Sequence, residues 1–322
     1  MTSHRQQHGL RNGGYALLIT LVMLALLGVI LGGLARRSAD AALQARAAEQ
    51  AMRQQWAELS CSYTLLNTAA DRAEQRLGLW QASFEEDAYA SSVVDPPGGY
   101  EVFSLKLAGL EVWGRIDDEE AKLNLNERLR ASPDRVIMPS SVVDEAIAPN
   151  RSTGLYLTRE PFVRTLGLRP LMSWAQVLPG WTPQALLGIN RPEALLEPHS
   201  TQAVVSRATL WGDGTLNIWT AQDPVMRQRL RDLVEPGTVE NLIGLRIAEP
   251  ALTLGTLIEN AAEDKDERAL LQGIFTERSS AYGMWLAVRD ETEQDAASPR
   301  WSLWVLEQGN DQEPGRPREH RW

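Results

Sequence analysis

The chain has 322 residues, which is long for one domain and compatible with two smaller domains plus an appendage. Its formal net charge of −10 lacks the basic footprint of a duplex-binding protein, so we expect no nucleic-acid partner. The single cysteine, Cys61, excludes an intramolecular disulfide and a multi-cysteine metal site.

The first long segment is apolar and uncharged. No charged residue occurs from Asn12 to Ala35, and residues 15–35 would span roughly 32 Å as a helix, about one hydrocarbon core. Arginines flank the segment on both sides, so charge alone leaves its orientation open. We predict a single transmembrane helix over 15–35. The small residues Gly33-Leu34-Ala35 leave an alternative, an ordinary signal peptide cut after Ala35.

A short polar leader, residues 1–14, precedes this segment and ends in Gly13-Gly14. The apolar stretch then starts at once with Tyr15. The arrangement resembles the prepilin-type signal of type IV pilins and type II secretion pseudopilins. The resemblance implies that prepilin peptidase cuts between Gly14 and Tyr15 on the cytoplasmic side, and that the new N-terminus is methylated.

The fifth residue counted from Tyr15 is Ile19, where most pilin-like proteins carry glutamate. A carboxylate in lipid is costly unless it is paired, and in pilins it is thought to pair with the neighbouring subunit's new amine. A subunit without it offers no anionic partner to an amine already in the fibre. Among pseudopilins, this absence is characteristic of the K-type minor subunit at the fibre tip.

Beyond Arg37, apolar residues recur at alternating steps of four and three, and no proline occurs before Pro96. We predict a continuous helix from Tyr15 to Trp80. Its C-terminal half should pack on the protein's own sheet, and its alanine-rich first half should offer a surface to a partner helix. The stripe consists of Met52, Trp56, Leu59, Tyr63, Leu66, Ala70, Ala73, Leu77 and Trp80.

Residues 95–99 form a strong turn signal, and residues 100–109 and 110–117 are predicted strands. Four consecutive carboxylates follow. Side chains of consecutive strand residues point to alternate faces, so the favoured interpretation is a solvated turn. These residues are Asp117, Asp118, Glu119 and Glu120.

Helical patches broken by proline fill residues 127–208, and Thr182 is predicted to cap a helix that starts at Pro183. A second helical stretch covers 224–262, and the charge run 263–267 is predicted to be a solvated loop. Residues 280–290 and 300–308 are predicted strands joined by a polar hairpin. The tail 309–322 is predicted to be disordered.

Four further segments, taken in order with the N-terminal signal, resemble general secretion pathway protein K, a minor pseudopilin family of type II secretion. They are DDEEAKLNLN (117–126), MSWAQVLPGWTPQALLG (172–188), GTLNIWTA (214–221) and SSAYGMWLAV (279–288). The resemblance implies an α+β fold, in which a long pilin-like N-terminal helix packs on an antiparallel sheet that carries a large helical insertion. Because some family members bind calcium, it also raises calcium at Asp117, Asp118, Glu119 and Glu120 as an alternative to the solvated turn.

The same resemblance implies a structural assembly protein that caps a periplasmic pseudopilus. Its expected partners are the I- and J-type minor pseudopilins, prepilin peptidase and the inner-membrane secretion platform. The helix would cross the inner membrane of a bacterial cell once, and the C-terminal domain would lie in the periplasm. No GxSxG, HExxH or Walker motif occurs, and we expect no enzyme activity.

The expected organisation is a leader (1–14), a transmembrane helix (15–35), the helix continuation with the first strands (36–126), a helical insertion (127–208), the rest of the pilin-like domain (209–308) and the tail. Deleting the insertion should leave a domain that folds. Two other functions remain open. One is a minor pilin of another type IV-like fibre, and the other is a signal-anchored periplasmic binding module.

Overall fold

The computed structural model describes the following residues: 11–86, 99–127, 172–178, 180–197, 203–231, 233–291, 299–308 and 315–320. Two of the helical patches predicted within 127–208, at residues 140–148 and 161–168, lie outside the described residues. The chain divides into two compact units, Met1–Gln55 and Trp56–Trp322.

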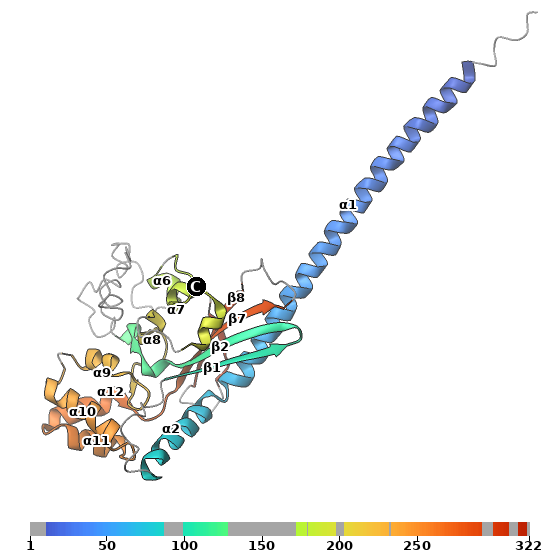
Figure 1. The fold of residues 1–322 in the computed structure, drawn as a ribbon. Helices are drawn as coiled ribbons and strands as arrows, with labels where there is room; N and C mark the ends of the chain where they lie inside the picture. Colours follow the sequence, from blue (N-terminus) through green and yellow to red (C-terminus); the bar gives the residue numbers. More distant parts are fainter. Residues whose placement is uncertain are drawn as a thin grey trace, which may run out of the picture. The chain divides into compact units, whose positions relative to one another are not determined.

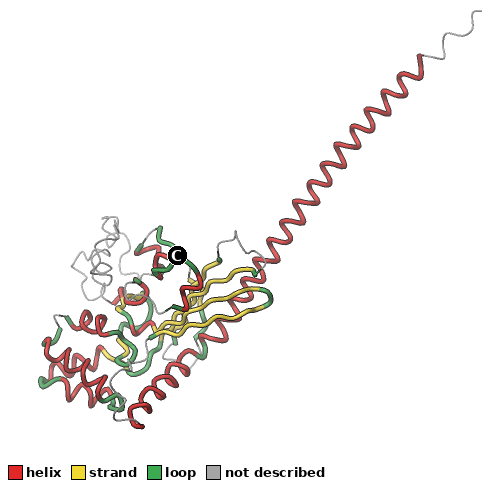
Figure 2. Tube along the Cα trace, viewed as in Figure 1, coloured by secondary structure: helices red, strands yellow, loops and turns green. Residues whose placement is uncertain are grey.

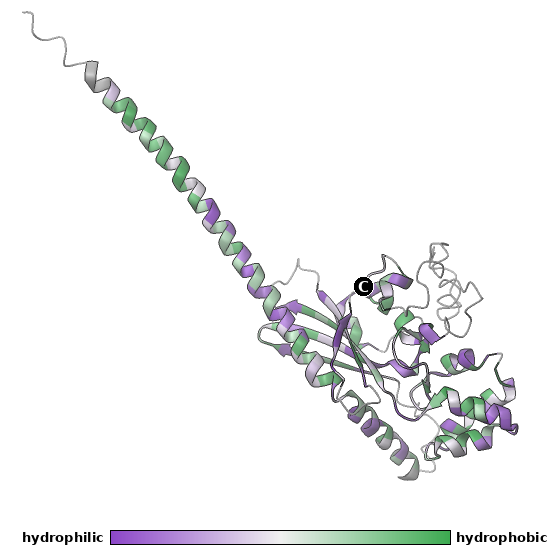
Figure 3. Cartoon of the chain, turned by 180° about the vertical axis from the view of Figure 1, so that it is seen from behind, coloured by the Kyte–Doolittle hydropathy of each residue, from purple (hydrophilic) through white to green (hydrophobic). Residues whose placement is uncertain are grey.

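The first unit consists of the N-terminal part of one long helix, α1 (Arg11–Cys61). Every described side chain from Tyr15 to Glu49 is exposed. Hydrophobic residues predominate along the first half of the helix (Figure 3). By length and composition alone, this helix could cross a membrane.

The predicted continuous helix is interrupted after Cys61. A π-helical turn, η1 (Ser62–Leu66), separates α1 from α2 (Ala69–Glu86). At this turn, Thr68 Oγ1 donates to the carbonyl oxygens of Thr64 and Leu65 at 3.1 and 3.2 Å. Arg72 Nη2 also donates to the Leu65 carbonyl, at 2.8 Å, which gives a displaced carbonyl a partner.

An antiparallel sheet is the centre of the second unit (Figures 1 and 2). Its order is β1-β2-β7-β8-β9, and its neighbouring strands all pair antiparallel. The turn between the first two strands, Ala108-Gly109, has positive φ at both residues, as a two-residue hairpin requires. The strands are β1 (Tyr100–Leu107), β2 (Leu110–Asp118), β7 (Ala281–Asp290), β8 (Arg300–Glu307) and β9 (Arg318–His320). The four longer strands were predicted.

The strand β9 corrects the prediction that the tail from residue 309 is disordered. Residues 318–320 pair with Leu303–Val305 of β8. The His320 ring also packs edge-on against Trp211, with ring centroids 5.3 Å apart. These contacts are made with residues outside the tail, on β8 and at Trp211, so the polar local composition does not show them.

One face of the sheet packs against the end of α1 and the residues that follow it. Ala57, Cys61, Leu66 and Ala69 are buried there among side chains of β2, β7 and β8. The prediction that the helix packs on the sheet is confirmed, but the predicted stripe is only partly the buried face. Trp56 is 63% exposed and Tyr63 is 48% exposed.

The other face of the sheet packs against the insertion. Leu186 and Leu195 are buried in one cluster with Trp285 and Val305 of the sheet. Removing the insertion would uncover these strands, and that the remaining domain folds without it stays a prediction. The described insertion elements are α6 (Trp174–Val177), α7 (Pro183–Leu187), η4 (Pro192–Leu196) and α8 (Val204–Arg207).

The predicted cap at Thr182 is confirmed. Its side chain accepts a hydrogen bond from the Ala185 N–H at 3.3 Å, and Pro183 is the first residue of α7. The helix ends at Gly188, whose φ of 66° favours glycine.

A separate hydrophobic cluster holds four further helices together with Trp80 of α2. The charge run 263–267 is not a loop throughout, because Asp264 caps a helix by accepting from the Asp266 N–H at 3.2 Å. Two short parallel ladders join β3 (Leu123–Asn124) to β4 (Ala208–Thr209) and β5 (Leu216–Asn217) to β6 (Phe275–Thr276). The helices are α9 (Asp223–Leu230), α10 (Pro236–Ala248), α11 (Leu254–Ala261) and α12 (Lys265–Ile274).

The packing of Phe103 on Gly114 gives a first prediction. A Cβ at Gly114 would overlap the Phe103 ring on the neighbouring strand. We expect Gly114→Ala to lower the free energy of unfolding of the full chain in detergent by about 1–2 kcal/mol, because the ring must leave its place. The matched control is Gly78→Ala in α2, where a Cβ has nothing within 4 Å. This control should stabilise by up to about 1 kcal/mol. Equal effects would contradict the packing argument.

Candidate functional sites in the apolar helix and the buried acidic segment

The apolar part of α1 is a candidate membrane and assembly site. A helix that is apolar on all sides needs an apolar environment around it. Tyr15 is 73% exposed and Ile19 is 56% exposed within the chain itself. The helix already includes Gly14, since α1 begins at Arg11. Cleavage between Gly14 and Tyr15 and the role of Ile19 stay predictions.

The second candidate site is the acidic segment that follows β2, and here the prediction of a solvated turn is wrong. Asp117, Asp118, Glu119 and Glu120 are 0, 4, 1 and 2% exposed. The segment leaves the end of β2 and enters a 3-10 turn, η2 (Glu119–Ala121). It is enclosed by residues that come from elsewhere in the chain.

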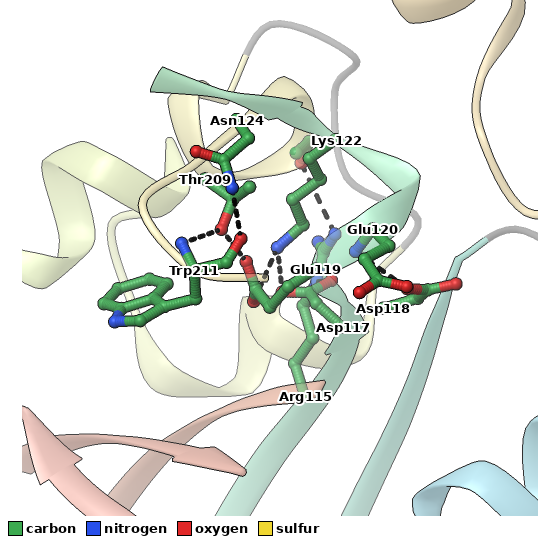
Figure 4. Close-up of polar contacts among 10 residues, drawn as sticks. Arg115, Asp117, Asp118, Glu119, Glu120, Lys122, Asn124, Thr209 and Trp211 are labelled. Carbon is green, nitrogen blue, oxygen red and sulfur yellow. Dashed lines mark hydrogen bonds and ion pairs between the residues drawn. The ribbon is translucent and has the colours of Figure 1, made fainter. Parts of the chain in front are cut away.

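Two of the carboxylates face cations. Arg115 Nε lies 2.6 Å from Asp117 Oδ1, and Lys122 Nζ lies 3.0 Å from Glu119 Oε1 (Figure 4). The same lysine lies 3.4 Å from Asp117 Oδ2, and Thr209 Oγ1 donates to Glu119 at 2.5 Å. Burial raises the pKa of Glu119, and the charge of Lys122 lowers it. Two positive and two negative groups therefore balance in this buried set.

The other two carboxylates face hydroxyl and amide groups. Asp118 accepts from Thr220 Oγ1 at 2.5 Å and from Asn217 Nδ2 at 3.3 Å. Glu120 accepts from the Ser280 N–H at 3.0 Å and from its hydroxyl at 2.5 Å. Burial raises the pKa of Asp118 and brings the pKa of Glu120 to about 7.

The calcium hypothesis does not fit this geometry. Calcium needs several oxygen ligands directed at one point. Here Asp117 and Glu119 are directed at a lysine, while Asp118 and Glu120 bind hydroxyl and amide donors. Within the described part of the chain, no group of three or more His, Cys, Asp and Glu residues could hold a metal ion.

The asparagines near these carboxylates make structural hydrogen bonds. Asn124 Oδ1 accepts from the Asn126 N–H at 2.9 Å, and its Nδ2 donates to the Trp211 carbonyl at 2.9 Å. Asn217, in the segment 214–221, bonds in a similar way. Its Oδ1 accepts from the Trp219 N–H at 2.9 Å, and its Nδ2 donates to Ser279 Oγ at 2.8 Å. Through these asparagines, residues 117–126 and 214–221 are each bonded to segments distant in the sequence.

The sequence did not predict a cavity of about 290 Å³ beside this region. Two basic residues, Arg316 and Arg318, and two acidic residues, Asp213 and Glu307, are among those that line it. The signal was absent because one wall is the strand β9, which was expected to be disordered. The Glu307 carboxylate accepts from the Gly212 N–H at 3.2 Å.

The buried lysine gives the second prediction. Lys122→Met leaves the carboxylates of Asp117 and Glu119 without this cation, so we expect the free energy of unfolding to fall by about 3–5 kcal/mol. Adding Glu119→Gln removes one of the uncompensated charges and should recover about 1–3 kcal/mol.

The control for this pair is Lys106→Met. Lys106 is 73% exposed and pairs with Glu291, so its replacement should change the stability by less than about 1 kcal/mol. Denaturant unfolding of the four proteins tests the set. A double variant less stable than Lys122→Met would contradict the proposed charge balance.

The class of the protein follows from these observations. It is an α+β protein with a pilin-like arrangement, a long N-terminal helix whose end packs on an antiparallel sheet.

Neither a family model nor a curated protein matches the chain. Among solved structures it is similar to a chain in the crystal structure of the GspK–GspI–GspJ complex from the type 2 secretion system of enterotoxigenic Escherichia coli. The identity is 13% and the TM-score 0.41, over 87% of this chain and 100% of that one. A likeness this loose says nothing of function.

Proposed function

We propose that this protein is a minor pseudopilin of type II secretion, which caps the tip of the periplasmic pseudopilus and helps to initiate its assembly. One observation carries the proposal. The uncharged helix that follows Gly13-Gly14 has no carboxylate at Ile19, and it continues into the helix end that packs on the antiparallel sheet.

The exposed apolar helix supports a role in the membrane and in a fibre. A signal peptide cut after Ala35 would be removed, and the mature chain would lose the apolar first half of α1. A prepilin-type leader is removed in front of the helix instead, so the helix stays with the sheet domain. This chain keeps one helix running from the apolar stretch to Ala57 and Cys61 at the sheet, which suits the second kind of processing.

Two features support the tip position. A subunit with Ile19 in place of glutamate has no carboxylate there for the amine of another subunit. In addition, the sheet domain carries the insertion helices on one face and a separate cluster of helices α9–α12. A domain enlarged in this way is hard to repeat along a tightly packed helical fibre, but it can occupy the last position, at the tip.

The proposal includes partners and a location. The I- and J-type minor pseudopilins would bind beside this subunit, prepilin peptidase would process it, and the inner-membrane platform would assemble it. The helix would cross the inner membrane once, with the sheet domain in the periplasm. The role is structural rather than enzymatic.

The third prediction tests processing directly. We expect Edman sequencing or mass spectrometry of the protein from its host's membranes to give an N-terminal Tyr15 with a methylated amine. Gly14→Leu should block this cleavage and the secretion of type II cargo, because it places a bulky side chain at the cleavage site, where the peptidase would have to accommodate it.

Gly28→Leu is the matched control, since it adds the same side chain to a position with nothing within 4 Å. It should be processed normally. A mature N-terminus at Arg36 would show an ordinary signal peptide and overturn the proposal, and so would normal processing of Gly14→Leu. If cleavage occurs but the protein fails to co-purify with the I- and J-type pseudopilins of its host, the minor pilin of another fibre becomes the better assignment.

A further inference from the structure

The end of α1 carries a carboxylate on its sheet-facing side. Glu58 is fully buried, and its Oε1 lies 2.9 Å from Nε of Arg300 on β8. Neither of its carboxylate oxygens has a hydrogen bond in the described structure. A buried carboxylate with one ion pair and no hydrogen bonds is poorly compensated for its lost hydration.

The surroundings of Glu58 do not supply a strong second compensation. Arg300 is 37% exposed, so water screens part of its attraction. Glu319, on β9, acts on Glu58 with a like charge. Burial, the largest effect, raises the pKa of Glu58 to about 7, against the lowering by Arg300. Cys61, the other titratable group beside it on α1, keeps its thiol, because burial raises the pKa to about 11.

Small side chains flank Glu58 on the sheet-facing side of the helix. Its sheet-facing neighbours are Ala57 and Cys61, which are small, and the π-helical turn η1 starts at Ser62. Small side chains bury little area, and each buried methylene contributes only about 0.8 kcal/mol. Leu66, which is fully buried, also holds this stretch on the sheet, and the charge state of Glu58 adds to or subtracts from that packing.

We propose that Glu58 acts as a pH-sensitive latch, which holds residues 56–66 tightly on the sheet when Glu58 is neutral and loosens when Glu58 is ionised. The ion pair with Arg300 limits this loosening. The latch concerns the docking of this helix end within the sheet domain. It goes beyond the proposed function, and it would operate in the isolated protein whether or not the chain belongs to a secretion fibre.

The sign follows from linkage. The docked carboxylate has a pKa of about 7 and an undocked one has its ordinary value of 4.5, so the docked state holds the proton more tightly. Docking is therefore most favourable below pH 4.5 and weakens as the pH rises towards 7 and beyond. The equilibrium constant for opening should rise about tenfold between pH 6 and pH 8.

Hydrogen exchange of the full-length protein in detergent, followed by mass spectrometry between pH 6 and pH 8, tests the proposal. Glu58→Gln is the reference, because it keeps the shape of the side chain and cannot ionise. Relative to this variant at each pH, peptides covering 56–66 of the unmodified protein should open about tenfold more at pH 8 than at pH 6.

The matched control is Glu101→Gln, which alters another pair between helix and sheet. Glu101 lies 2.6 Å from Nη1 of Arg72 and is 26% exposed. This variant should keep the full pH response of residues 56–66. Parallel pH profiles for the unmodified protein and Glu58→Gln would overturn the latch, and so would loss of the response in Glu101→Gln.

Arg300→Gln gives a second, independent measurement should Glu58→Gln unfold. Without the cation, the pKa of Glu58 should rise further, so the opening of 56–66 should level off at a higher pH than in the unmodified protein. An unchanged profile in Arg300→Gln would contradict the ion pair that helps to set the pH range of the latch.

Discussion

The cost of removing a carboxylate from water is the constraint on which this structure depends. The acidic segment at the end of β2 buries four carboxylates in succession, and three of them, Asp118, Glu119 and Glu120, bind groups from distant parts of the chain. Thr209 and Ser280, which bind Glu119 and Glu120, are 90 and 160 residues away in the sequence. The full set of partners exists only when the insertion has closed onto one side and β7 has paired. The buried charges therefore tie the end of β2 to segments that local propensity could not bring together.

Much of the fold could be predicted because its causes are local. The uncharged apolar run from Asn12 to Ala35, the apolar and aromatic residues of the four longer strands and the Thr182-Pro183 cap each depend on neighbouring residues. The acidic segment was misjudged because a charge run is normally solvated, and only partners such as Lys122 and Thr209 make its burial tolerable. The strand β9 was missed for the same kind of reason, since its pairing partner is β8 and its packing partner is Trp211.

At the sheet end of α1, the periodicity of apolar residues predicted the helix correctly but not which of its faces is buried. The apolar stripe singled out Trp56 and Tyr63, yet both are largely exposed. The sheet instead receives Ala57 and Cys61, whose small side chains let the helix backbone come close. A stripe of large apolar side chains indicates where a helix can bury apolar surface. Close packing of a helix on a sheet also favours small side chains. The π-helical turn at Ser62 then shifts the phase, so that Leu66 and Ala69 face the sheet again.

The same desolvation rule relates the two ends of α1. At its sheet end the helix tolerates Glu58, because Arg300 comes within ion-pair distance, although the compensation is incomplete. In the apolar part, no cation occurs from Asn12 to Ala35, so a carboxylate at position 19 would have no partner within its own segment. In lipid, such a carboxylate could be tolerated only if another chain supplied the positive charge. A chain that carries Ile19 has no such requirement.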